Sequence, residues 1–183
     1  MRMTGAVCSV VLAFVAARHA SATVLLPADF QTVVAGSGTI VHGRVIDVRS
    51  ALVGPRRAIE TFVTVEVLDA WKGSPGSSVT FRVPNGQVGR YRRVLVGAPE
   101  FAGGDEVVVF LRGQAPAIPA LFGLSQGVYR VSRGARARPV VAPPPVMARG
   151  DGAERVARGE SARQPLPLEA FAREVEAVLE RDR

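Results

Sequence analysis

The chain has 183 residues and a formal net charge of +7 at pH 7, from 23 lysines and arginines against 16 aspartates and glutamates. Lys72 is the single lysine, so the positive charge is almost all arginine, whose planar guanidinium binds carboxylates or phosphates through paired hydrogen bonds. This charge indicates either an anionic partner or a bias toward arginine codons. One cysteine excludes a disulfide within the chain, and one cysteine with two histidines offers too few ligands for a zinc site. No segment has the spacing of a calcium-binding loop, so we expect neither a metal nor a cofactor.

Residues 1–22 have the pattern of a secretory signal peptide. After a basic start, the apolar run Val7–Ala17 is too short to span a bilayer, and Ala20-Ser21-Ala22 supplies the small residues that a signal peptidase recognises. We expect cleavage before Thr23, loss of Cys8, and export to the periplasm or the medium. No later run approaches the roughly 20 apolar residues of a transmembrane helix, so none is expected after cleavage.

A short helix is expected at the start of the mature chain. Asp29 is a suitable N-terminal cap, and Phe30, Val33 and Val34 recur at helical spacing before Gly36. These apolar residues predict a helix that lies on the protein core.

Three segments then alternate apolar and polar residues with the two-residue period of a β-strand. They are the run from Thr39, with Val41, Gly43 and Val45 on its apolar side, then Thr61–Asp69 and Ser78–Val83. His42 and Arg44 lie on the polar side of the first run. A loop is expected over Ser50–Pro55 and a hairpin turn over Trp71–Gly76. Connections this short predict an antiparallel meander.

The next part of the sequence is more irregular. Residues 84–104 contain a short predicted strand, Val94–Val96, and a turn at Gly103–Asp105. The almost uninterrupted apolar run Glu106–Leu111 is typical of a strand buried on both faces, and the N-terminal helix could cover one of them. Leu121–Val131 is predicted as the last strand.

Composition changes after Arg133. Residues 134–165 are rich in proline, glycine and arginine and predict a flexible linker. Residues 166–183 predict an amphipathic helix. Its apolar stripe consists of Leu168, Phe171, Ala172, Val175, Val178 and Leu179. This stripe could pack on the chain's own sheet or dock on a partner.

The candidate binding residues form a basic cluster, Arg90, Tyr91, Arg92 and Arg93. Three guanidinium groups around an aromatic ring suit a polyanion, including single-stranded nucleic acid. Predicted export argues against nucleic acid. The remaining interpretations are a solvated or salt-bridged loop and a contact with an acidic protein or glycan.

No catalytic residue stands out. His42, the histidine left after cleavage, is interpreted as a solvent-facing or hydrogen-bonded strand residue, because no nucleophile and third group can be assigned to it. A pair of carboxylates could act as in glycosidases, but spacing singles out no two. The candidates are Glu60, Glu66, Asp69, Glu100, Asp105 and Glu106.

Three of the predicted strands, residues 39–48, 61–73 and 103–111, together resemble the netrin-like and tissue-inhibitor-of-metalloproteinase-like domains of the OB-fold. The features in common are a helix before the first strand, a Trp-Lys-Gly turn after the second, and a glycine-acid pair before an apolar strand. Residues 96–101 and 125–131 are also similar to small exported bacterial proteins of uncharacterised function. The likeness covers Asp29–Val131 and implies a five-stranded OB-like barrel. The animal inhibitors chelate a protease zinc through an N-terminal cysteine, and this chain has no cysteine after Cys8.

We therefore expect a mainly β protein: a five-stranded antiparallel OB-like barrel within residues 23–133, a short N-terminal helix, a linker and a C-terminal amphipathic helix. The sequence favours an exported, non-catalytic binding domain that contacts an exported protein or an anionic cell-envelope polymer through Arg90–Arg93. The alternatives are a hydrolase that uses acidic residues on the barrel face, and a protease inhibitor that acts without an N-terminal cysteine.

Overall fold

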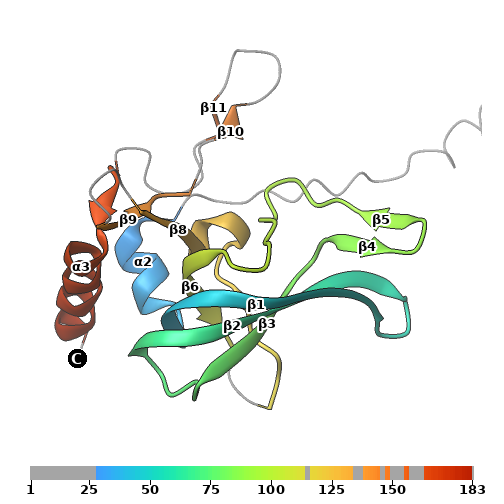
Figure 1. The fold of residues 1–183 in the computed structure, drawn as a ribbon, viewed down its shortest axis with the longest axis horizontal. Helices are drawn as coiled ribbons and strands as arrows, with labels where there is room; N and C mark the ends of the chain where they lie inside the picture. The colour runs from blue at the N-terminus through green and yellow to red at the C-terminus, as the bar shows by residue number, and fades with distance from the viewer. Residues whose placement is uncertain are drawn as a thin grey trace, which may run out of the picture.

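The computed structural model describes residues 28–113, 116–133, 138–144, 147–148, 155–156 and 163–182, so the predicted signal peptide lies outside it. The helices and strands, in chain order, are α2 (Phe30–Ala35), β1 (Thr39–Val53), β2 (Ala58–Lys72), β3 (Ser78–Val83), β4 (Gly86–Val88), β5 (Tyr91–Arg93), β6 (Glu106–Arg112), β7 (Ala120–Leu121), the 3-10 helix η1 (Leu124–Gly127), β8 (Val128–Arg133), β9 (Pro139–Ala142), β10 (Met147–Ala148), β11 (Arg155–Val156), β12 (Leu166–Pro167) and α3 (Leu168–Arg181). The two α-helices lie at one end of the molecule and the β4–β5 hairpin at the other (Figure 1).

Five strands close into a barrel in the order β1-β2-β3-β7-β6, with β6 returning to pair with β1. The predicted five-stranded OB-like barrel is confirmed. It is mixed rather than antiparallel, because β3 and β7 run parallel, with Arg82 beside Ala120. The physical reason is topological: a closed ring with an odd number of strands cannot alternate direction all the way round, so one neighbouring pair must be parallel.

The alternation in the strands produces two separate apolar cores. The barrel interior is filled mainly by valines, among them Val41 and Val45 of β1 and Val63 and Val65 of β2. The predicted inward side of the first strand is therefore confirmed. Strand β6 contributes to both cores, because its odd-numbered residues face into the barrel and Val108 and Phe110 face outward.

Helix α2 covers the outer face of β6, as predicted. Phe30, Val33 and Val34 are buried in the same core as Phe110. Asp29 caps the helix by accepting a hydrogen bond from the Thr32 amide at 2.7 Å. This backbone hydrogen bond, with a smaller contribution from the Thr32 side chain, holds the pKa of Asp29 below its usual value.

Helix α3 packs against the same outer core, so the predicted stripe folds back on the chain's own sheet. Phe171, Val175 and Val178 are buried. The Phe171 ring centroid lies 4.8 Å from that of Tyr129 and 5.4 Å from that of Phe30. Aromatic contacts at these distances add to the apolar area that the helix buries.

The sheet continues beyond the barrel through β8, β9 and β12. Strand β9 lies inside the range predicted as a flexible linker, so that prediction is wrong for Pro139–Ala142. The short apolar run pairs with β8, and its Val141 is buried against the outer core. Strands β10 and β11 also fall in this range, where they pair with each other. Residues 134–137, 145–146, 149–154 and 157–162 of that range lie outside the described residues.

Three local predictions are corrected. The loop expected over Ser50–Pro55 is largely strand: β1 continues to Val53 because every residue from Asp47 to Val53 has a cross-strand partner in β2. The strand expected over Val94–Val96 is absent from the described structure, where β5 ends at Arg93. The strand expected over Leu121–Val131 is divided into β7, η1 and β8, because Gly123 has a φ of +51° that turns the chain.

We expect Phe171→Ala to lower the free energy of unfolding by about 3 kcal/mol, because it leaves a cavity between α2, α3 and the sheet. The measurement is urea denaturation followed by circular dichroism. Arg173→Ala, on the exposed face of the same helix, is the matched control and should leave the unfolding midpoint nearly unchanged. Equal midpoints for the two variants would show that α3 does not stabilise the folded state.

Candidate functional site

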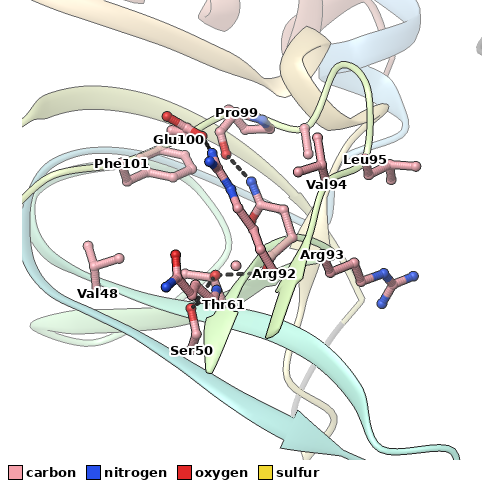
Figure 2. A pocket seen from close by; sticks show the side chains of 14 residues that line it. Val48, Ser50, Thr61, Arg92, Arg93, Val94, Leu95, Pro99, Glu100 and Phe101 are labelled. Atoms are coloured by element: carbon pink, nitrogen blue, oxygen red, sulfur yellow. Dashed lines mark hydrogen bonds and ion pairs between the residues drawn. The ribbon is translucent and has the colours of Figure 1, made fainter. Parts of the chain in front are cut away.

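The candidate site is a groove of about 410 Å³ at the end of the molecule opposite α3. One side is the outer part of the β1–β2 hairpin, residues 47–53 paired with 58–64, which we call the outer ribbon. The other sides are the β4–β5 hairpin and the 94–101 loop. Figure 2 shows the side chains that line this groove.

A chain of hydrogen bonds forms the floor of the groove. The Thr61 hydroxyl donates to the Asn85 carbonyl at 2.7 Å and lies 3.0 Å from the Ser50 hydroxyl. Ser50 Oγ also accepts from the Gln87 amide at 3.3 Å. Because Thr61 uses its proton on Asn85, the Ser50 hydroxyl donates to Thr61. These bonds attach β4 to the groove-facing side of the outer ribbon.

Gly86 is required where β4 crosses this floor. Its φ is +133°, and a Cβ atom there would lie 2.4 Å from both Ser50 Oγ and Thr61 Oγ1. Both the backbone conformation and the close approach exclude a larger residue. Nothing in the sequence around Gly86 predicts what this glycine faces.

The 94–101 loop is held in place from three sides. The Asn85 side chain donates to the Pro99 carbonyl at 3.1 Å, and the Ser125 amide donates to the Gly97 carbonyl at 3.2 Å. The Arg130 guanidinium bonds to the Glu100 carbonyl and to Asp105. This side of the groove is therefore built by residues distant in sequence.

The predicted basic cluster is divided by the structure. Arg92 and Arg93 line the groove. Arg92 reaches across to Glu100, with Nη2 3.3 Å from Oε1, whereas Arg93 points away from this pair and donates to the Ile59 carbonyl at 3.2 Å (Figure 2). Arg90 and Tyr91 lie outside the groove and contact each other, with the guanidinium 5.1 Å from the ring centroid.

Exposed apolar side chains at the edges of the groove were missed by the sequence analysis. Val94 and Val96 are 69% and 70% exposed, and Val48 and Leu52 of β1 are 37% and 40% exposed. Val48 and Val94 line the groove from opposite sides. The apolar run at residues 94–96 was a sequence signal, but it was interpreted as a strand.

His42 lies in a different part of the molecule, on the outer face of the barrel. It is 5% exposed, so it is the hydrogen-bonded strand residue that the sequence allowed rather than a solvent-facing one. Its Nδ1 lies 3.2 Å from Asp69 Oδ2 and its Nε2 lies 2.9 Å from Glu106 Oε1. Because both ring nitrogens contact carboxylates, neither is available to activate a nucleophile.

The carboxylates considered for a hydrolase do not form a pair in the groove. Glu100 is the one acidic residue among its lining residues. Asp105 pairs with Arg130, Glu60 lies 3.6 Å from Arg82, and Asp69 and Glu106 contact opposite sides of His42. Glu66 is exposed on β2. Within the described residues, His, Cys, Asp and Glu form no group of three that could hold a metal ion.

Comparisons with protein families, with curated proteins and with solved structures gave no match. Across the described residues, none of the helices combines the length and the apolar character needed to cross a bilayer.

We expect Gly86→Ala to lower the free energy of unfolding by about 1–3 kcal/mol, because it forces a strained φ and separates β4 from the floor. Thermal unfolding provides the measurement. Gly103→Ala is the matched control, since a Cβ there meets no atom within 4 Å and its φ is not positive. If both variants unfolded at the same temperature, the close contact at Gly86 would be refuted.

We expect His42→Phe to lower the free energy of unfolding by about 1–3 kcal/mol. The phenylalanine ring can still stack on Trp71, but Glu106 loses its hydrogen-bond partner. The readout is the unfolding free energy in urea. Asp69→Asn is the comparison variant. That carboxylate is 63% exposed, so its replacement should cost less. A His42→Phe protein as stable as the wild type would contradict a structural role for this histidine.

Proposed function

We propose that this protein is an exported, non-catalytic binding domain that holds an acidic partner in the groove between the outer ribbon and the β4–β5 hairpin. The partner class is an exported protein or an anionic polymer of the cell envelope. One observation carries the proposal: the groove combines an accessible arginine, Arg92, with apolar side chains on both of its sides.

The electrostatics of the hairpin support an acidic partner. Arg90 and Arg92 are exposed side chains on or beside β5, and the nearest carboxylate paired with either is that of Glu100. A guanidinium binds a carboxylate through two parallel hydrogen bonds, so a single weak contact at 3.3 Å leaves Arg92 with donors for a second anion.

The composition of the groove supports binding rather than hydrolysis. A glycosidase-type mechanism needs two carboxyl groups on opposite sides of the scissile bond, and the groove lining contributes one. An open groove in which arginine and apolar residues gather is instead typical of a surface that binds another macromolecule.

The test is charge reversal at two of the exposed arginines, Arg90→Glu with Arg92→Glu. Arg93 is left unchanged because its guanidinium bonds to the Ile59 carbonyl, so its loss could disturb the fold. We expect the double variant to fold normally and its retention on an isolated cell-envelope fraction at low salt to fall about fivefold or more.

The matched control is Arg138→Glu with Arg173→Glu, two exposed arginines beside and on α3, which makes the same change in net charge at the far end of the molecule. We expect this variant to keep most of its retention. Equal loss of retention in the two double variants would show that net charge alone explains the loss. Unchanged retention in the groove variant would refute the proposed contact.

A further inference from the structure

Apolar groups at the groove indicate what kind of acidic partner fits. Among the described residues, most of the exposed large apolar side chains lie on the outer ribbon, at Ile46 directly before it, or within residues 91–96. Of these, Val48 and Val94 line the groove, whereas Tyr91 lies outside it. Arginine is enriched among the residues that contribute most energy in protein–protein interfaces, and exposed apolar side chains grouped beside it mark a surface that binds another macromolecule.

A polysaccharide fits this groove less well than a polypeptide. Sugar rings commonly bind by stacking on an accessible aromatic face, and Phe101 is the aromatic residue among the lining residues. Its ring makes a T-shaped contact with that of Phe81, with centroids 5.4 Å apart, and the Arg130 guanidinium lies over it at 5.5 Å. A polypeptide ligand brings apolar side chains that can contact Val48 and Val94.

Glu100 is in the position that a ligand carboxylate would take. Its backbone is held through the Arg130 contact with its carbonyl, but its side chain is 80% exposed and reaches Arg92 from the edge of the groove. An ion pair this exposed contributes little stability, so exchange for another carboxylate costs little. Because Glu100 belongs to the same chain, its carboxylate is nevertheless present beside Arg92 at a high effective concentration and competes with a ligand carboxylate.

This arrangement selects for more than negative charge. A simple anion must compete with the tethered Glu100 for Arg92 and gains nothing else. A ligand that carries an apolar side chain next to its carboxylate also gains apolar contacts with Val48 and Val94, which offset the competition.

We infer that the groove binds an acidic protein segment with apolar side chains beside its carboxylates, and that one ligand carboxylate replaces Glu100 on Arg92. The inference rests on the proposed function and adds to it the class of partner and a built-in competitor. Arg92 is the residue for which the two carboxylates compete.

The experiment measures the affinity of the full chain for three probes of equal charge: a short labelled peptide of alternating valine and glutamate, a polyglutamate peptide, and an oligosaccharide of galacturonate. The proteins are the wild type, Glu100→Gln, Arg92→Gln and the variant that carries both substitutions. Fluorescence anisotropy at low salt gives each dissociation constant.

We expect the valine–glutamate peptide to bind tightest. Glu100→Gln should tighten its binding about twofold to fivefold, as expected when an exposed competing ion pair is removed, and Arg92→Gln should weaken it about fivefold to tenfold. In the presence of Arg92→Gln the Glu100 substitution should have almost no effect, because its partner is gone. Glu176→Gln, on the exposed face of α3, is the control for loss of one negative charge away from the groove and should leave the affinity unchanged.

The outcomes separate the inference from the proposed function. If Arg92→Gln weakens binding but Glu100→Gln does not tighten it, the competitor role is overturned and the binding groove stands. If the galacturonate probe binds as tightly as the valine–glutamate peptide, the assignment to a protein segment is overturned. If no probe binds, or Arg92→Gln binds as well as the wild type, the proposed function itself is refuted.

Discussion

Strand β6 is packed on both of its faces, with Val107 and Val109 inside the barrel and Val108 and Phe110 beneath the helices. Its backbone pairs with β1, β7 and β8, so it closes the barrel on one side and joins it to the outer strands on the other. A change that disrupts the pairing of β6 would therefore disturb both cores. Both helices and the barrel therefore depend on the same seven residues.

The groove is a consequence of unequal strand lengths around this strand. Strand β1 has 15 residues and β6 has seven, and β6 pairs only as far as Arg44 of β1. Beyond the Val45 contacts with Gly104 and Asp105, β1 leaves the barrel with β2 as its partner. One face of this ribbon then meets the β4–β5 hairpin and the 94–101 loop, and the groove lies between them (Figure 2).

Residues from four separate parts of the chain meet at the groove, and each contribution has a different physical basis. Ser50 and Thr61 supply hydroxyls that hold β4, and Gly86 lets the hairpin approach them. Arg130, from β8, fixes the 94–101 loop through the Glu100 carbonyl. The accessible guanidinium of Arg92 is thus held on a frame that it does not itself stabilise. This separation lets charge at the groove change with little effect on the fold.

Much of the fold was predictable from local pattern. A period of two in apolar residues identified β1, β2 and β3, an unbroken apolar run identified β6 as buried on both faces, and helical spacing identified α2 and α3. The failures occurred where local pattern carries little information. Val94–Val96 has the composition of a strand but no partner strand in the described structure, and Pro139–Ala142 is too short and too close to prolines to be distinguished from a linker.

The sequence by itself determined which residues are apolar and at what period, and therefore the elements, the mainly β class and the presence of a basic cluster at Arg90–Arg93. Tertiary structure alone decided that β3 and β7 run parallel, that Arg92 faces Glu100 while Arg93 bonds to Ile59, and that His42 is buried between Asp69 and Glu106. The physical reason is range: periodicity is set by neighbours along the chain, whereas these contacts depend on how separate strands and loops are placed against one another in the folded protein.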